Sequence, residues 1–123
     1  MAIKLTDREA EVMEVLWQRG PSTVAEVREA LADDLAYTTV LTILRTLEAK
    51  AYVRHDAEGR THRYSALIEL EKARRSAARA LIEKLFTGSA ELLLVHLVTQ
   101  EKLSESQIER IKSLLENRSR KKR

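Results

Sequence analysis

Small hydroxyl side chains and one arginine gather in residues 38–46. If this segment is a helix, five side chains lie away from its apolar face: Thr38, Thr39, Thr42, Arg45 and Thr46. A threonine hydroxyl can hydrogen-bond a phosphate or a base, its methyl group can contact thymine, and an arginine can hold guanine through two hydrogen bonds. Each threonine alone could be ordinary surface, but an ordinary exposed helix would carry Glu and Lys, which have higher helix propensity. The cluster therefore favours a helix that reads base edges.

Arginines recur in the segment that follows. From Tyr52 to Ala66 apolar and polar residues alternate, which predicts a two-stranded hairpin. With Glu58-Gly59 as its turn, Arg54 would face Arg63 across the ladder, which is repulsive unless an anion lies against that face. We expect three arginines of the hairpin to contact phosphates or the minor groove: Arg54, Arg60 and Arg63.

The same register pairs two histidines. His55 would lie opposite His62, and directly paired histidines on a hairpin can bind zinc. Two ligands are too few for a zinc site, and Asp56 points to the other face of its strand. We therefore predict no metal site on the hairpin.

Catalysis has little support in the sequence. No serine lies near a base that a third group could orient, and there is neither a glycine-rich phosphate loop nor a carboxylate cluster with metal-ligand spacing. The absence of Cys removes thiol nucleophiles and thiolate metal sites as well. We predict a protein that is not an enzyme and uses no cofactor.

The composition indicates a small cytoplasmic protein. Its 123 residues are 44% apolar and 33% charged, and the lack of Cys suits a reducing compartment. The longest apolar run, 92–95, is far shorter than the ~20 residues that a membrane helix needs. The first residues also lack the apolar stretch of a signal peptide. We expect neither export nor membrane insertion.

Positive charge is unevenly distributed. The net charge is +3, but residues 1–66 carry nine basic against eleven acidic side chains, whereas residues 67–123 carry thirteen against eight. Around the hairpin, residues 45–66 carry five basic and three acidic side chains. The end of the chain, 118–123, includes five cations and could either bind a polyanion or form a frayed, solubilising tail. This distribution is compatible with a nucleic-acid partner.

Capping boxes and turn residues predict the elements of the first lobe. Thr6-Asp7-Arg8-Glu9 and Thr23-Val24-Ala25-Glu26 each have the spacing of a helix start. Gly20-Pro21 should end the first helix, and a third helix should run over about 37–50. Three helices followed by a basic hairpin are the order of a winged helix-turn-helix, whose third helix fits the major groove of double-stranded DNA. We assign residues 1–66 to this DNA-binding domain.

Three further helices are expected after the hairpin, so the fold class is mostly α with a small β wing. An apolar stripe begins at Leu70, Ser89 should cap a helix that is apolar nearly all round, and Ser104 with Gln107 forms another capping box. This lobe, 67–117, shows more apolar surface than it can bury alone, so we predict a homodimer. Folding back onto the first lobe as a monomer is the alternative. The predicted interface consists of Leu81, Leu85, Phe86, Leu92, Leu93, Val95, Ile108, Ile111 and Leu115.

Four motifs, in this order, resemble those of the BlaI/MecI penicillinase-repressor family. They are LW with PSTVAEV within residues 16–27, YTTVLTILRTL at 37–47, GRTHRY at 59–64 and FTGS at 86–89. The resemblance covers nearly the whole chain. It implies an N-terminal winged helix, a C-terminal dimerisation lobe, and repression of transcription by a homodimer at dyad operators built on TACA/TGTA half-sites. We expect the half-site centres to lie one or two helical turns apart, ~10–21 bp.

The resemblance also implies a mode of control linked to antibiotic resistance. In the penicillinase repressors a membrane sensor-protease, activated by β-lactam, cuts the repressor in its dimerisation lobe. The Asn-Phe pair that is cut corresponds here to His96 and Leu97, the candidate site of proteolytic inactivation, and this departure argues against a protease of the same preference. The Cys pairs of the copper-responsive relatives are absent, which excludes that kind of metal sensor.

Three further positions depart from the family pattern. Thr46 stands where the family usually has Arg, Ala51 replaces a Gly at the end of the reading helix, and His62 replaces an aromatic residue of the hairpin. These changes indicate an altered operator preference. A rival interpretation keeps the winged helix but makes it an adaptor for another protein. Only the repressor predicts a duplex affinity that falls steeply with salt.

Overall fold

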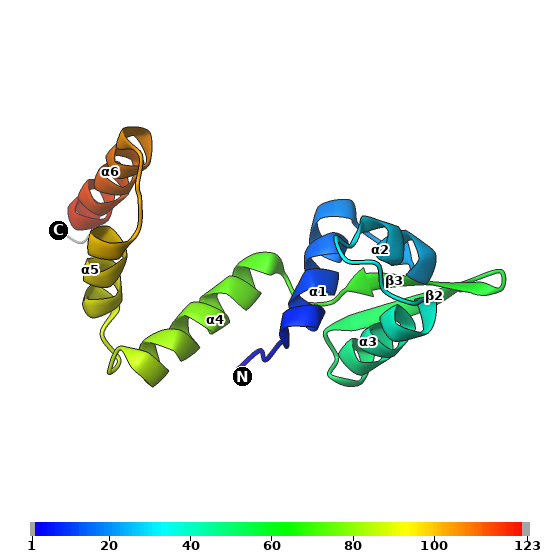
Figure 1. The fold of residues 1–123 in the computed structure, drawn as a ribbon. Helices are drawn as coiled ribbons and strands as arrows, with labels where there is room; N and C mark the ends of the chain where they lie inside the picture. The colour runs from blue at the N-terminus through cyan, green and yellow to red at the C-terminus, as the bar shows by residue number, and fades with distance from the viewer. Residues whose placement is uncertain (1, 122–123) are drawn as a thin grey trace. The chain divides into compact units, whose positions relative to one another are not determined.

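The computed structural model describes residues 2–121, which form six helices and three short strands (Figure 1). The helices are α1 (Asp7–Arg19), α2 (Val24–Ala30), α3 (Tyr37–Ala49), α4 (Leu70–Leu85), α5 (Ala90–Gln100) and α6 (Glu105–Lys121). The strands are β1 (Ser22–Thr23), β2 (Val53–Glu58) and β3 (Thr61–Ala66). The chain divides into two compact units within α4: the first ends at Ala80 and the second begins at Leu81. The predicted fold class, mostly helical with a small β wing, is confirmed.

The core of the first unit lies between α1, α2, α3 and the base of the sheet. Apolar residues at helical spacing on α1 and α3 are buried there. The core consists of Val12, Met13, Leu16, Val24, Val27, Val40, Leu44, Leu47, Val53 and Tyr64. Trp17 packs at its edge, where the indole Nε1 donates a hydrogen bond to the carbonyl of Ile68 (2.9 Å). Because one face of α3 is anchored in this core, its opposite face is directed to solvent.

Both predicted capping boxes of the first unit are present. The Thr6 hydroxyl accepts from the Glu9 amide (3.2 Å), and the Glu9 carboxylate accepts from the Thr6 amide (2.9 Å). Thr23 and Glu26 form the same pair of bonds at the start of α2, at 3.2 and 2.9 Å. These reciprocal bonds satisfy two of the amides that a helix leaves unpaired at its N-terminus, which explains why both starts could be predicted.

The hairpin is confirmed, but its predicted turn is wrong. Gly59 and Arg60 form the turn, since Glu58 pairs with Thr61. The turn is therefore centred one residue later than Glu58-Gly59. Gly59 adopts φ +62, a left-handed conformation that costs a glycine less than any residue with a side chain. The strands therefore pair with Arg54 opposite Ser65 rather than Arg63. The expected repulsion between facing arginines does not arise.

The hairpin is joined by a third strand, and this strand was not predicted from the sequence. The two residues of β1 pair antiparallel with β3, Ser22 with Tyr64 and Thr23 with Arg63, giving the strand order β1-β3-β2. Such a short strand has no readable alternation of its own. It places the N-terminus of α2 beside the hairpin.

Helix α3 ends in a Schellman motif that is closed by an alanine. The amide of Tyr52 donates to the carbonyl of Leu47 (3.0 Å), and the amide of Ala51 donates to the carbonyl of Glu48 (2.9 Å). Ala51 takes φ +66, where glycine is the favoured residue. Retaining alanine there costs roughly 1 kcal/mol of stability.

A partly buried ion pair joins the start of α1 to the end of α3. The Glu9 side chain is 6% exposed, and Lys50 Nζ donates to both of its carboxylate oxygens, at 2.8 and 3.0 Å. Burial by itself raises the pKa of Glu9, but the hydrogen bonds from Lys50 and the Thr6 amide, with the charge of Lys50, outweigh it. The pKa therefore lies below its ordinary value of 4.5.

Glu9→Gln should lower the free energy of unfolding at pH 7 by about 1 kcal/mol, because glutamine can keep the capping box but not the ion pair. A carboxyl group whose pKa is lowered by folding stabilises the protein above its ordinary pKa and loses that contribution as pH falls through the lowered value. The difference between wild type and variant should thus be full at pH 7 and shrink below pH 4.5. Urea titrations at several pH values measure it. A difference that stays constant down to acid pH would show that the charge of Glu9 is irrelevant.

Capping signals also set the helices of the second unit. The Ser89 hydroxyl accepts from the Leu92 amide (3.0 Å) at the start of α5, and Ser104 with Gln107 forms the predicted capping box of α6. Among the described residues of α5 and α6, none is fully buried.

Within residues 2–121, no helix is both long and apolar enough to cross a membrane.

His96 is exposed within the second unit, although α5 is apolar nearly all round. Its ring lies edge-on to Phe86, with ring centres 5.8 Å apart. No residue of α5 is buried, so its apolar composition did not translate into burial within one chain.

Candidate nucleic-acid interface

The outward face of α3 carries all five residues that the sequence assigned to base reading. Each of them is exposed: Thr38, Thr39, Thr42, Arg45 and Thr46. The Thr42 hydroxyl donates to the carbonyl of Thr38 (2.9 Å), and the Thr46 hydroxyl donates to the carbonyl of Thr42 (2.9 Å). Because each hydroxyl hydrogen is used in this way, the two hydroxyl oxygens can only accept further hydrogen bonds. In this conformation they suit a base amino group and cannot donate to a phosphate.

Arg45 stands on this face with its guanidinium available. Within residues 2–121 it forms neither a hydrogen bond nor an ion pair. Its charge acts on Tyr64 in the core. Burial raises the pKa of Tyr64 and the charge of Glu48 raises it further, whereas the charge of Arg45 lowers it. An exposed guanidinium without a partner retains its full set of donors for a ligand.

The arginines of the wing, the β2-β3 hairpin, fall into two kinds. Arg60, in the turn, has no ion pair or hydrogen bond with any described residue. Arg54 is paired with Asp56 at 3.2 Å, but both side chains are largely exposed, so this bond is weak. Both cations remain accessible to a phosphate.

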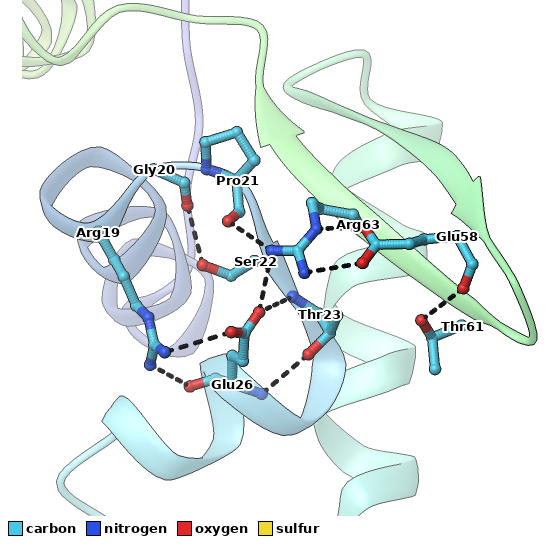
Figure 2. Close-up of polar contacts among 9 residues, drawn as sticks. All are labelled: Arg19, Gly20, Pro21, Ser22, Thr23, Glu26, Glu58, Thr61 and Arg63. Carbon is cyan, nitrogen blue, oxygen red and sulfur yellow. Dashed lines mark hydrogen bonds and ion pairs between the residues drawn. The ribbon is translucent and has the colours of Figure 1, made fainter.

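Arg63 is held by the protein itself (Figure 2). Its Nε and Nη2 donate to the carboxylate of Glu58, and its Nη1 donates to Glu26 Oε1 (3.1 Å) and to the carbonyl of Pro21 (3.1 Å). The sequence grouped Arg63 with the other wing arginines. It does lie on the same strand face as Arg54, as its diagonal neighbour, but its guanidinium is bound by acceptors of the protein. Glu26 and Pro21 are remote in sequence, and only the spacing of Glu58 from Arg63 across the turn hinted at an ion pair.

Glu48 joins the wing to α3. Its carboxylate accepts from the His55 amide (3.1 Å) and lies 2.7 Å from His55 Nδ1. The predicted pairing of His55 with His62 is wrong, because His55 lies opposite Tyr64 and His62 opposite Ala57, although both histidines lie on one strand face. The imidazoles of His55 and His62 are stacked with centres 4.3 Å apart. In the described part of the chain, no three His, Cys, Asp or Glu side chains converge in a way that could hold a metal ion.

Comparison with known proteins agrees with this geometry. The sequence profile of the penicillinase repressor family matches residues 5–117. The chain is 39% identical to the transcriptional regulator BlaI of Mycobacterium tuberculosis, over 77% of this chain and 72% of the relative. It is 22% identical to the methicillin resistance regulatory protein MecI of Staphylococcus aureus, over 91% of this chain and 93% of the relative.

The fold is also similar to that of a solved structure. A MarR family protein from Bacillus stearothermophilus superposes with a TM-score of 0.52 at 18% identity, covering 97% of this chain and 76% of that one. This likeness concerns the fold alone. The sequence matches identify the family: this chain belongs to the penicillinase repressor family, which consists of DNA-binding transcriptional repressors and not of enzymes.

Proposed function

We propose that this repressor acts as a homodimer on a dyad operator, with the outward face of α3 in the major groove of each half-site. The observation that carries the proposal is the unpartnered guanidinium of Arg45 among exposed threonines. Arginine recognises guanine through O6 and N7, and threonine can accept from a base amino group. The half-sites would be of the TACA/TGTA kind, with a preference altered by Thr46. Because its partner is the chromosome, the proposed location is the cytoplasm.

The wing would contact the DNA backbone beside each half-site. Arg60 in the turn and Arg54 on β2 are accessible cations at the hairpin. Phosphate contacts of this kind supply affinity and register without sequence information.

Exposed apolar side chains of the second unit support the dimer. Of the nine predicted interface residues, six are exposed: Leu81, Leu85, Leu92, Val95, Ile108 and Leu115. The other three, Phe86, Leu93 and Ile111, are half-buried. A monomeric soluble protein seldom leaves so many large apolar side chains in water, so a second copy is the proposed cover.

Release from DNA by a membrane sensor-protease would act on this same unit. The candidate pair His96 and Leu97 lies inside α5 and is exposed. Cleavage there would need local unfolding of α5, because proteases bind extended chain, and a preference other than Asn-Phe. Treating the full-length dimer with the activated protease and sequencing the new N-terminus tests the site.

Fluorescence anisotropy with the duplex upstream of the gene tests the proposed function. The native duplex and a scrambled duplex of equal length are titrated at several salt concentrations. A specific repressor should prefer the native duplex by ~10³-fold or more. Equal, weak binding to both duplexes would favour the rival function, an adaptor that carries a winged helix and binds DNA only through its charge.

Arg60→Ala should weaken binding to native and scrambled duplexes alike, since a phosphate contact carries no sequence information. The slope of log affinity against log salt should become shallower by about 0.9, the value for one lost phosphate contact. Arg8→Ala is the matched control, because Arg8 is also exposed but pairs with Glu11 and Asp33. An unchanged slope in Arg60→Ala would remove Arg60 from the interface.

A further inference from the structure

We propose that Arg63 is a positioning residue that fastens the wing to the N-terminus of α2, and that it does not contact DNA. The inference rests on the proposed function, because it concerns how the wing is presented to the operator. It reverses the expectation from sequence, which placed Arg63 among the phosphate contacts.

The guanidinium of Arg63 joins two elements at once (Figure 2). On the wing, Nε and Nη2 form a two-pronged bond with the carboxylate of Glu58. On the other side, Nη1 donates to Glu26 in the first turn of α2 and to the carbonyl of Pro21 before β1, both at 3.1 Å. All three guanidinium nitrogens thus donate to protein acceptors, and the planar fork of arginine is the side chain that can serve these acceptors together.

Glu26 extends this connection into the helical body. It is the third residue of α2, and its Oε1 accepts from the Thr23 amide (2.9 Å) as well as from Arg63. Its Oε2 lies 3.4 Å from Arg19 Nη2 at the end of α1, and Arg19 also donates to the Glu26 carbonyl (3.1 Å). Figure 2 shows the wing, the cap of α2 and the end of α1 linked through this one carboxylate. Since α2 is packed in the core of the first unit, the bond sets the direction of the wing relative to the helices.

Charge balance argues against a phosphate contact by Arg63. The cluster contains two arginines, Arg19 and Arg63, and two carboxylates, Glu26 and Glu58, so it is neutral as a whole. The hydrogen bonds and charge of Arg63 lower the pKa of Glu58, which keeps that carboxylate ionised. A phosphate approaching Arg63 would meet both carboxylates, and moving Arg63 to it would leave Glu58 without its cation, while Glu26 would keep only Arg19. Arg60 carries no such restriction.

The register explains why the cluster forms. With Glu58 opposite Thr61 and Asp56 opposite Arg63, Glu58 and Arg63 are diagonal neighbours on one strand face. Diagonal pairs lie within reach of long side chains. Pairing of β1 with β3 sets Thr23 opposite Arg63 and brings the first turn of α2 to the same place.

Two wing carboxylates provide a matched test. Glu58→Ala and Asp56→Ala each remove one largely exposed negative charge, but only Glu58 holds Arg63. In the full-length protein, simple electrostatics predicts that both changes strengthen binding to the native duplex. If Arg63 positions the wing, Glu58→Ala should weaken binding by about three- to tenfold, whereas Asp56→Ala should leave it unchanged or stronger. Stronger binding by Glu58→Ala would overturn the proposal.

Substitutions of Arg63 separate positioning from contact. Lysine can contact a phosphate as a point charge but cannot replace the fork, so Arg63→Lys should bind as weakly as Arg63→Ala. The salt slope of both should match wild type, since no phosphate contact is lost, while their thermal unfolding shows whether they remain folded at the assay temperature. Wild-type affinity in Arg63→Lys, or a slope shallower by about 0.9 in Arg63→Ala, would overturn the proposal.

Hydrogen exchange of the protein without DNA gives a result that does not depend on the proposed function. Glu58→Ala and Arg63→Ala should both speed exchange of the wing amides, by about three- to tenfold, because the wing loses its connection to α2. Asp56→Ala should change them less. Unchanged exchange in both variants would overturn the positioning role even if wild type binds its operator. If wild type does not distinguish native from scrambled duplex, the proposed function fails, and the exchange result alone decides whether Arg63 fastens the wing.

Discussion

Arg45→Ala is expected to weaken binding to the native operator by ~1–3 kcal/mol, about 5- to 150-fold. It should also flatten discrimination at the base pair that Arg45 contacts. The reason is geometric: the guanidinium lies on the exposed face of α3 without a described partner, so its donors can pair with guanine O6 and N7. Loss of one base contact should leave the remaining positions of the operator discriminated as before.

Anisotropy with a set of duplexes, each carrying one changed base pair, measures this effect. Arg45→Lys is the informative control, since it keeps the charge but loses the two-pronged bond. We expect it to recover part of the affinity and little of the discrimination. Arg45→Ala with wild-type affinity and specificity would mean that α3 does not lie in the major groove as proposed.

Leu85→Asp is expected to break the homodimer. Leu85 is 67% exposed in the single chain, so the substitution should leave each subunit folded. If a second copy covers this position, an unpaired carboxylate would be buried there, which should cost about 3 kcal/mol or more and raise the dimer dissociation constant over 100-fold. Binding to a full dyad operator should weaken, because the two half-sites would no longer be engaged together.

Sedimentation at micromolar concentration gives the oligomeric state directly. Leu67→Asp is the matched control, because Leu67 is 51% exposed but precedes α4 and lies outside the predicted interface. The control should remain dimeric. If Leu85→Asp remained dimeric, the interface would lie elsewhere. A monomeric wild type would favour the alternative in which one chain covers its own apolar helices.

Local signals explain how much of the fold could be predicted. The boxes at Thr6 and Thr23 depend on residues three positions apart, and the buried stripe of α3 depends on helical spacing. Interactions within one turn of helix do not need to know the rest of the chain. The same holds for the exposed face of α3, because burial of Val40, Leu44 and Leu47 leaves the opposite side chains outside.

Other features depended on a single residue of register or on one hydrogen bond. Placing the turn at Glu58-Gly59 put Arg54 directly opposite Arg63, whereas the observed turn at Gly59 and Arg60 makes them diagonal neighbours on the same strand face. The threonines of α3 were predicted as donors or acceptors, but the bonds of Thr42 and Thr46 to their own helix leave acceptors only. Composition and spacing could not decide either point, because the competing arrangements have the same residues on the same faces.

Three features could be predicted from the sequence alone: the order of the elements, the helix that presents threonines and Arg45 outward, and the family. These depend on short-range capping, on periodicity and on motifs that can be read in one dimension. The three-dimensional fold was needed to see that Arg63 is held by Glu58 and Glu26, unlike the accessible cations of the wing. Its partners Glu26 and Pro21 are 37 and 42 residues away, and they meet it because β1 pairs with β3. The arginines of the wing thus have two environments. Arg63 is bound by acceptors from several segments of the first unit, whereas Arg54 and Arg60 remain accessible.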